Sequence, residues 1–148
     1  MYNSELWNLT KTKEKQIDAF QRKLLRQTLN ITYPKKISND KLYKITKSKP
    51  WSKSIKRRRI RFFGHILRLH PSTPIKQALT EVTTQTHKRK AGRPKTTWIN
   101  MMRNDLDTFL KTTGQSDKIF LEKATILAQN RLQWNLIPSK LQGTESCM

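Results

Sequence analysis

The residues best suited to chemistry are the cations of one short basic stretch. Between residues 53 and 68 the sequence carries seven Lys and Arg: Lys53, Lys56, Arg57, Arg58, Arg59, Arg61 and Arg68. Such side chains bind phosphate oxygens through charge-assisted hydrogen bonds, and in a helix they would extend over about 24 Å, the span of several phosphates. Because backbone contacts carry no base identity, the stretch predicts nucleic-acid affinity without sequence specificity. The alternative is a solvated charged face that binds no ligand.

A second basic stretch lies further along the chain. Its cations are also predicted to contact nucleic acid, and they are Lys88, Arg89, Lys90, Arg93 and Lys95. The Gly92-Arg93-Pro94 centre is similar to the AT-hook, whose extended core inserts an Arg into a narrow minor groove. Ala91 stands where an AT-hook usually has a further Arg, so a non-specific basic loop or a nuclear-import signal is the alternative.

Residues for catalysis or metal binding are sparse. Only ten Asp and Glu occur, and the closest pair, Asp105 and Asp107, would lie about 200° apart around a helix, too far to share an ion. His65 and His70 are five residues apart rather than four, so we expect His65 to pack or to contact phosphate. No Gly-x-Ser-x-Gly elbow occurs. We expect no catalytic residue, metal or cofactor, and no enzyme activity in this chain alone.

The charge balance predicts a polyanionic partner. Lys and Arg number 31 against 10 Asp and Glu, a net charge of +21, and residues 51 to 100 carry most of it. That third is the expected contact surface, and the nearly neutral last third is the expected scaffold. No long apolar run and no signal-peptide-like start occur, so we expect an intracellular protein, nuclear or also cytoplasmic, without a membrane or small-molecule partner. Cys147 alone allows no disulfide framework.

The elements that position these residues are predicted to be helices, because apolar residues recur at intervals of three and four. We expect an all-α fold of about five short amphipathic helices in a small irregular bundle, with a basic central loop and a disordered C-terminal tail. The expected segments are Lys13–Leu29, a short helix capped by Ser38, Ser52–Leu69, a short helix begun by Thr73-Pro74, one capped by Thr96 or Thr97, and one from Ile119 that stops at Pro138.

These segments suggest four regions. Residues 1–81 form a basic helical region, 82–95 a basic loop, 96–137 a C-terminal helical pair and 138–148 a disordered tail. Three aromatic residues, Trp51, Phe62 and Trp98, lie beside the basic stretches. Core packing is the expected role for all three, and stacking on a base is the alternative.

Several short motifs together resemble one family, the C-terminal region of LINE-like non-LTR retrotransposon reverse transcriptases, downstream of the polymerase palm. The similarity extends over about residues 5 to 135. The Arg-rich, Gly-His-Ile-Leu-Arg and Gly-Arg-Pro-x-x-x-Trp elements in this order are its most specific part. The motifs that carry it are Leu6–Lys11, Ala19–Arg26, Ile37–Tyr43, Arg58–Arg68, Gly92–Trp98 and Ala128–Trp134.

The resemblance implies a thumb-like, post-polymerase region that grips template RNA or target DNA, while synthesis takes place upstream. The chain lacks the Asp-Asp polymerase motif and an endonuclease, and with Cys147 alone it cannot form the zinc knuckle of some relatives. It therefore resembles a remnant or a separate fragment. The expected function is binding of RNA or DNA backbone by this fragment. The alternative is a protein-docking module for the upstream polymerase.

Overall fold

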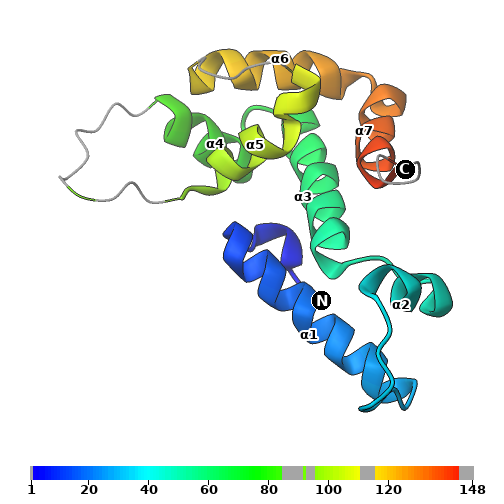
Figure 1. Cartoon of the computed structure of the whole chain (residues 1–148). Coiled ribbons are helices and arrows are strands. Elements are labelled where there is room, and N and C mark those ends of the chain that lie inside the picture. Colours follow the sequence, from blue (N-terminus) through cyan, green and yellow to red (C-terminus); the bar gives the residue numbers. More distant parts are fainter. Residues whose placement is uncertain (1, 85–91, 93–95, 111–115, 144–148) are drawn as a thin grey trace. The chain divides into compact units, whose positions relative to one another are not determined.

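A computed structural model describes residues 2–84, 92, 96–110 and 116–143 of the chain. The described residues form α-helices and no strands, so the predicted all-α class is confirmed (Figure 1). They contain seven α-helices, one more than the six expected segments. A short 3-10 turn, η1 (Ser4–Leu6), precedes them. The helices are α1 (Lys11–Thr28), α2 (Asn39–Thr46), α3 (Trp51–Arg68), α4 (Pro74–Thr84), α5 (Trp98–Leu110), α6 (Asp117–Gln129) and α7 (Arg131–Gly143).

Local capping explains where several helices begin. The Ser38 hydroxyl accepts the Lys41 backbone N–H at 3.3 Å at the start of α2, as predicted. Thr97, rather than Thr96, caps α5 by accepting the Asn100 N–H at 3.3 Å. Such side chains satisfy backbone donors that have no partner within the helix. The sequence therefore locates these helix starts to within a residue.

The C-terminal part of the chain differs from the prediction. Residues 117–143 form two helices instead of one, because Asn130 interrupts the run and its side chain accepts the Gln133 N–H at 3.1 Å, which starts α7. Pro138 lies inside α7, although it was expected to end the helix. Its ring is fully buried, and that packing offsets the backbone hydrogen bond that proline cannot donate. Residues 138–143 are thus helical rather than disordered, and 144–148 lie outside the described residues.

The chain forms two compact units. Unit 2 comprises residues 9–56, and unit 1 comprises residues 1–8 and 57–148. The boundary falls inside α3, whereas the sequence suggested a division at residues 82–95. Moreover, α4 continues to Thr84, so the expected loop starts at least three residues later than predicted.

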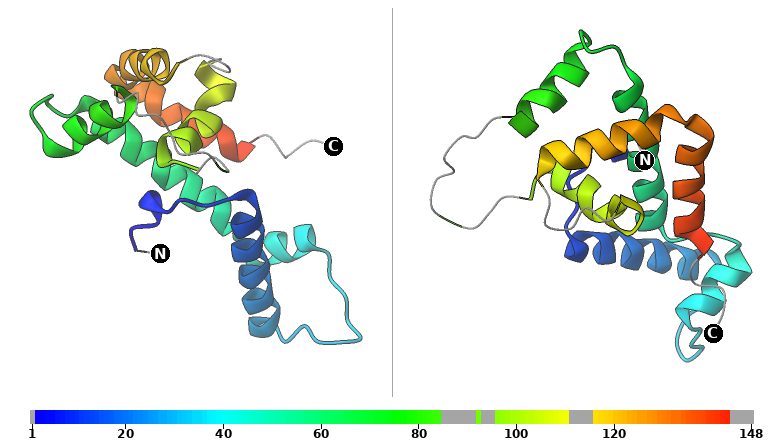
Figure 2. Two further views of the ribbon diagram at one scale, coloured as in Figure 1. Left: turned by 90° about the vertical axis from the view of Figure 1, so that its left-hand side faces the viewer. Right: turned by 90° about the horizontal axis from the view of Figure 1, so that it is seen from above.

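Unit 1 has a well-defined apolar core. In both Figure 1 and the right-hand view of Figure 2, α5 and α7 lie on either side of the α3 segment that belongs to unit 1. The Phe63 ring stacks on Phe120 with centroids 5.9 Å apart and meets Trp98 edge-on at 5.7 Å. Around these rings are buried Ile60, Ile66, Leu67, Leu79, Ile99, Met102, Leu106, Ala124, Ala128, Trp134 and Ile137. This core fixes which side of α3 can meet solvent.

A close contact between α3 and α7 depends on one glycine. The Trp134 indole N–H donates to the Ile60 carbonyl at 3.1 Å, and its ring passes directly over Gly64. A Cβ atom at residue 64 would lie 2.1 Å from Trp134 Nε1, far inside van der Waals contact. Gly64 is therefore needed here for the close approach of the indole and not for backbone freedom.

Unit 2 is stabilised by side-chain hydrogen bonds as much as by apolar burial. Its buried residues are Gln21, Leu42 and Ile55. Pro50 precedes α3 and has no side-chain acceptor, so α1 supplies the cap. The Asp18 carboxylate accepts the Ser52 backbone N–H at 2.9 Å and the Ser52 hydroxyl at 2.6 Å. In addition, Gln21 accepts the Trp51 N–H at 2.8 Å and donates to the Lys49 carbonyl at 2.9 Å.

Candidate nucleic-acid interface

Two arginines and a histidine form an exposed stripe on the part of α3 that belongs to unit 1. Arg58, Arg61 and His65 are all exposed, and their spacing of three and four residues places them within about 60° around the helix. Ile60, Phe63 and Leu67, by contrast, are buried in the core of unit 1. An exposed polar side and a buried apolar side opposite are thus present in this part of α3. We refer to Arg58, Arg61 and His65 as the α3 stripe.

Arg59 does not belong to this stripe. Its side chain is 1% exposed, and Nε and NH2 donate to Asp105 Oδ2 at 2.9 and 2.6 Å. A buried guanidinium paired with a carboxylate cannot reach a phosphate in solution, so Arg59 is removed from the predicted contacts. The same pair explains Asp105, which the sequence had considered only as a metal ligand. Burial of each charge is possible because the other neutralises it.

Arg57 and Arg68 are intermediate in exposure. Arg68 donates from NH1 to the Ala128 carbonyl at 3.1 Å, in the last turn of α6, where backbone acceptors lack partners within the helix. It therefore stabilises the end of α6 while remaining partly open to solvent. The Nε atom of Arg57 is buried without a hydrogen-bond partner. Both residues remain predicted phosphate contacts, with part of each side chain committed to the scaffold.

The remaining predicted contacts belong to unit 2 or lie outside the described residues. Lys53 and Lys56 belong to unit 2 and are half-buried. The second basic stretch lies outside the described residues at Lys88, Arg89, Lys90, Arg93 and Lys95. Gly92, the described residue at its centre, has φ of 135°, a conformation that favours glycine. The similarity to an AT-hook therefore stays a prediction.

Unit 2 carries a basic surface that sequence analysis undervalued. Residues 9–56 contain 14 Lys and Arg against 3 Asp and Glu, a net charge of +11, and ten of these cations are exposed. Its own carboxylates can neutralise at most three of them. The sequence already contains this excess of Lys and Arg. It was undervalued because net charge was counted over three successive thirds of the chain, and unit 2 extends over the first two of them. The exposed cations are Lys11, Lys13, Lys15, Lys23, Lys35, Lys36, Lys41, Lys44, Lys47 and Lys49.

Other cations of unit 1 serve the scaffold. Lys76 donates from Nζ to the Leu67 carbonyl at 2.8 Å, and burial lowers the pKa of this amine because desolvation disfavours its charged form. Arg103 pairs with Asp117 and lies over the Phe120 ring, 5.6 Å from its centroid. These contacts join neighbouring helices, so the net charge of unit 1 overstates its capacity to bind phosphate.

The three ambiguous aromatic residues mainly pack. Trp51 lies 6.3 Å from Phe20 within unit 2. Trp98 contacts the core of unit 1, and its indole N–H donates to the Glu5 carbonyl at 3.0 Å, which attaches η1 to α5. Phe62 packs edge-on against Trp98 at 6.4 Å but stays half-buried. Of the three, Phe62 also reaches an open cavity.

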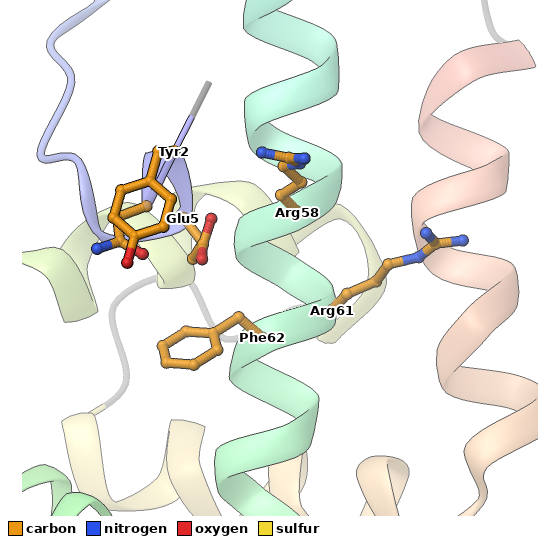
Figure 3. Close-up of a pocket in the computed structure, with 6 residues that line it drawn as sticks. Tyr2, Glu5, Arg58, Arg61 and Phe62 are labelled. Carbon is orange, nitrogen blue, oxygen red and sulfur yellow. The ribbon is translucent and has the colours of Figure 1, made fainter.

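This cavity has a volume of about 610 Å³ and lies between η1 and α3, both parts of unit 1. Figure 3 shows Phe62 extending from α3 on the side where Tyr2 and Glu5 lie, whereas Arg61 points away from them. Its lining residues are Tyr2, Asn3, Glu5, Arg58, Arg61 and Phe62. Sequence reasoning missed Tyr2 and Glu5, because no motif marks them and only the folding of η1 onto α3 places them beside Arg58.

Neither a metal centre nor a membrane-spanning segment is found in the described part of the chain. No three His, Cys, Asp or Glu side chains gather there as ligands, and His70 instead bonds with the Ser72 hydroxyl at 2.7 Å. Within the same residues, no helix combines the length and the apolar character that crossing a bilayer requires. Comparisons of the chain with protein-family models, curated proteins and solved structures found no match.

Proposed function

We propose that this chain is a nucleic-acid-binding region that grips the sugar-phosphate backbone of RNA or DNA. The observation that carries the proposal is the α3 stripe, in which Arg58, Arg61 and His65 are exposed while the apolar residues of the same turns are buried. A rigid helix holds these donors at fixed spacing, so binding a phosphate chain requires little ordering of the protein.

The charge of unit 2 supports the same function. A region of 48 residues with a net charge of +11 repels itself and attracts any nearby polyanion. Two phosphate-binding surfaces on one chain would also raise the affinity through effective concentration. Binding through many Lys and Arg contacts is expected to depend strongly on salt and weakly on base sequence.

We further propose that the chain derives from the post-polymerase region of a LINE-like retrotransposon. This rests on the ordered motifs, and two of them meet in the folded chain, since Gly64 of the Arg58–Arg68 motif lies under Trp134 of the Ala128–Trp134 motif. In this proposal the chain has no polymerase activity of its own. Sequencing the DNA immediately upstream tests the origin: an intact or decayed Asp-Asp polymerase frame supports it, and unrelated sequence contradicts it.

A salt titration tests nucleic-acid binding. If about six phosphates are neutralised, the logarithm of the binding constant for a short duplex should fall against the logarithm of salt with a slope near −5. The double variant Arg58→Gln/Arg61→Gln should make the slope less negative by about 1.8, because two contacts are lost. A flat titration of the unmodified protein would contradict the proposal.

A matched variant controls for charge alone. Lys118→Gln/Arg131→Gln also removes two exposed cations from unit 1, but these residues lie on α6 and α7, outside the α3 stripe. It should leave the slope within experimental error of the original protein. Equal changes in the two double variants would show that binding follows net charge and that the α3 stripe is not the contact.

A second candidate function, docking onto a protein such as the upstream polymerase, is favoured by exposed apolar residues in the nearly neutral last third. Leu132 and Leu136, four residues apart on α7, are 80% and 55% exposed, and Ile126 on α6 is 74% exposed. Replacing Leu132 and Leu136 by Ser should abolish nuclease-resistant co-purification with the polymerase. If this change has no effect, docking through this surface is excluded.

A further inference from the structure

The cavity between η1 and α3 presents three kinds of chemistry in one place. It offers the aromatic rings of Tyr2 and Phe62, the cation of Arg58 and the carboxylate of Glu5 (Figure 3). Tyr2 is 88% exposed, so its ring faces solvent instead of packing in the core. The cavity volume of about 610 Å³ lies within the range of small-ligand pockets, roughly 300 to 1,000 Å³.

One class of ligand satisfies all three groups. A nucleotide has a flat base that stacks on aromatic rings, a phosphate that pairs with arginine, and base N–H groups that donate to a carboxylate. We propose that this cavity binds an unpaired nucleotide of a single strand, with its base against Tyr2 and Phe62, its phosphate on Arg58 and its exocyclic amino group on Glu5. This inference rests on the proposed function and names the form of nucleic acid that it binds.

The cavity is built on the scaffold of unit 1. The Glu5 carbonyl accepts the Trp98 indole N–H at 3.0 Å, and Phe62 packs against the same indole. Ser4, the first residue of the turn, is fully buried, and Arg58 NH1 lies 3.5 Å from its hydroxyl. The backbone that carries Glu5 and the ring of Phe62 are therefore positioned before a ligand arrives, which lowers the entropy lost on binding.

The geometry favours a single strand over a duplex. Bases within a duplex are stacked on their neighbours, so no free face remains for Tyr2. The adenine N–H that is not used in pairing lies in the deep, narrow major groove of an RNA duplex, which side chains such as Glu5 do not enter. The α3 stripe continues from Arg58 to Arg61 and His65 on the same helix, so phosphates next to the bound nucleotide can follow it. Duplex binding would use the stripe alone.

The experiment compares a short oligoadenylate strand with an RNA duplex of equal length, by fluorescence anisotropy on the full chain. Tyr2→Leu should weaken oligoadenylate binding about 5- to 150-fold, the usual effect of losing one base-stacking ring, and leave duplex binding unchanged. Tyr2→Phe should retain single-strand binding because the ring remains. Tyr33→Leu is the matched control, because Tyr33 is also 88% exposed but belongs to unit 2 and does not line the cavity.

Glu5 gives a second readout. Glu5→Gln should reduce the preference for oligoadenylate over oligouridylate about 10-fold, since adenine has the exocyclic amino group that uracil lacks. If Tyr2→Leu and Tyr33→Leu have the same effect on oligoadenylate while salt-dependent binding persists, the cavity proposal is overturned and the proposed function stands. If the unmodified protein binds neither the strand nor the duplex, both the cavity proposal and the proposed function are contradicted.

Discussion

The two units of this chain are stabilised in different ways. Unit 1 buries a contiguous apolar cluster around Phe63 and Trp134. Unit 2 buries only Gln21, Leu42 and Ile55 to the same degree, and it leaves Phe20 56% exposed. Its helices are instead connected by side-chain caps on the start of α3. The comparison teaches that helices of similar amphipathic character can rest on apolar packing in one region and on directed polar contacts in another.

The same contrast applies to the cations. In unit 1, Arg59, Arg68, Lys76 and Arg103 each bind a carboxylate or a backbone carbonyl of a neighbouring element. In unit 2 most Lys and Arg are exposed, and three carboxylates serve fourteen cations. Several cations are thus part of the scaffold in unit 1, whereas most cations of unit 2 are exposed and raise its charge. Three substitutions test how differently the two units are stabilised, and they are given in order of decreasing expected effect.

Arg59→Met should destabilise unit 1 most. It removes the guanidinium that donates two hydrogen bonds to Asp105, so this carboxylate, whose side chain is only 11% exposed, stays buried with less of its charge compensated. Breaking one side of such a pair typically costs about 3 to 5 kcal/mol. Urea denaturation, combined with hydrogen exchange at the amides of α3 and α5, measures the loss and assigns it to unit 1.

The control for this change is the double variant Arg59→Met/Asp105→Leu. Replacing both charges by apolar side chains should recover most of the lost stability, because no buried charge remains. If the double variant is as unstable as Arg59→Met alone, loss of packing by the long Arg side chain, and not the loss of charge compensation at Asp105, explains the effect.

Gly64→Ala should destabilise unit 1 by a smaller amount. In an exposed helix interior this change stabilises by roughly 0.5 to 1 kcal/mol, but here the new Cβ overlaps the Trp134 indole. Overpacking of this kind costs about 1 to 3 kcal/mol, so the sign should reverse. Thermal unfolding measures this loss of stability. In the double variant Gly64→Ala/Trp134→Leu, the loss caused by Gly64→Ala should largely disappear. A stabilising Gly64→Ala would show that α7 does not pack this closely on α3.

Asp18→Ala should have the smallest effect, and it should be confined to unit 2. The change removes the carboxylate that caps the start of α3, and losing a helix cap costs about 1 kcal/mol. Hydrogen exchange should become faster in α1 and the first turn of α3. Asp40→Ala removes the same charge from an exposed position of α2 and should have less effect. Equal effects would mean that charge balance, rather than the cap, stabilises unit 2.

Much of the fold follows from local sequence. Ser38, Thr97 and Thr73-Pro74 mark helix starts because capping involves residues within one turn. The prediction that the last helix stops at Pro138 was wrong. The free-energy cost of proline in a helix is local, whereas the burial that offsets this cost depends on residues distant in sequence. Of the candidate site, the sequence identified Arg58 and Arg61 of α3. It did not identify Tyr2 or Glu5, which line the same cavity as these arginines only in the folded chain.

By itself, the sequence determined the helical class, the strong positive charge and the separation of α3 into a basic and an apolar side, because periodicity and composition are properties of the chain alone. Only the tertiary structure decided which of the arginines are buried and which are exposed. Arg57, Arg58 and Arg59 are identical in chemistry and adjacent in sequence, yet Arg59 is buried against Asp105, which follows 46 residues later. Desolvating a charge is possible only where the fold supplies its counter-charge, and no local pattern records that pairing.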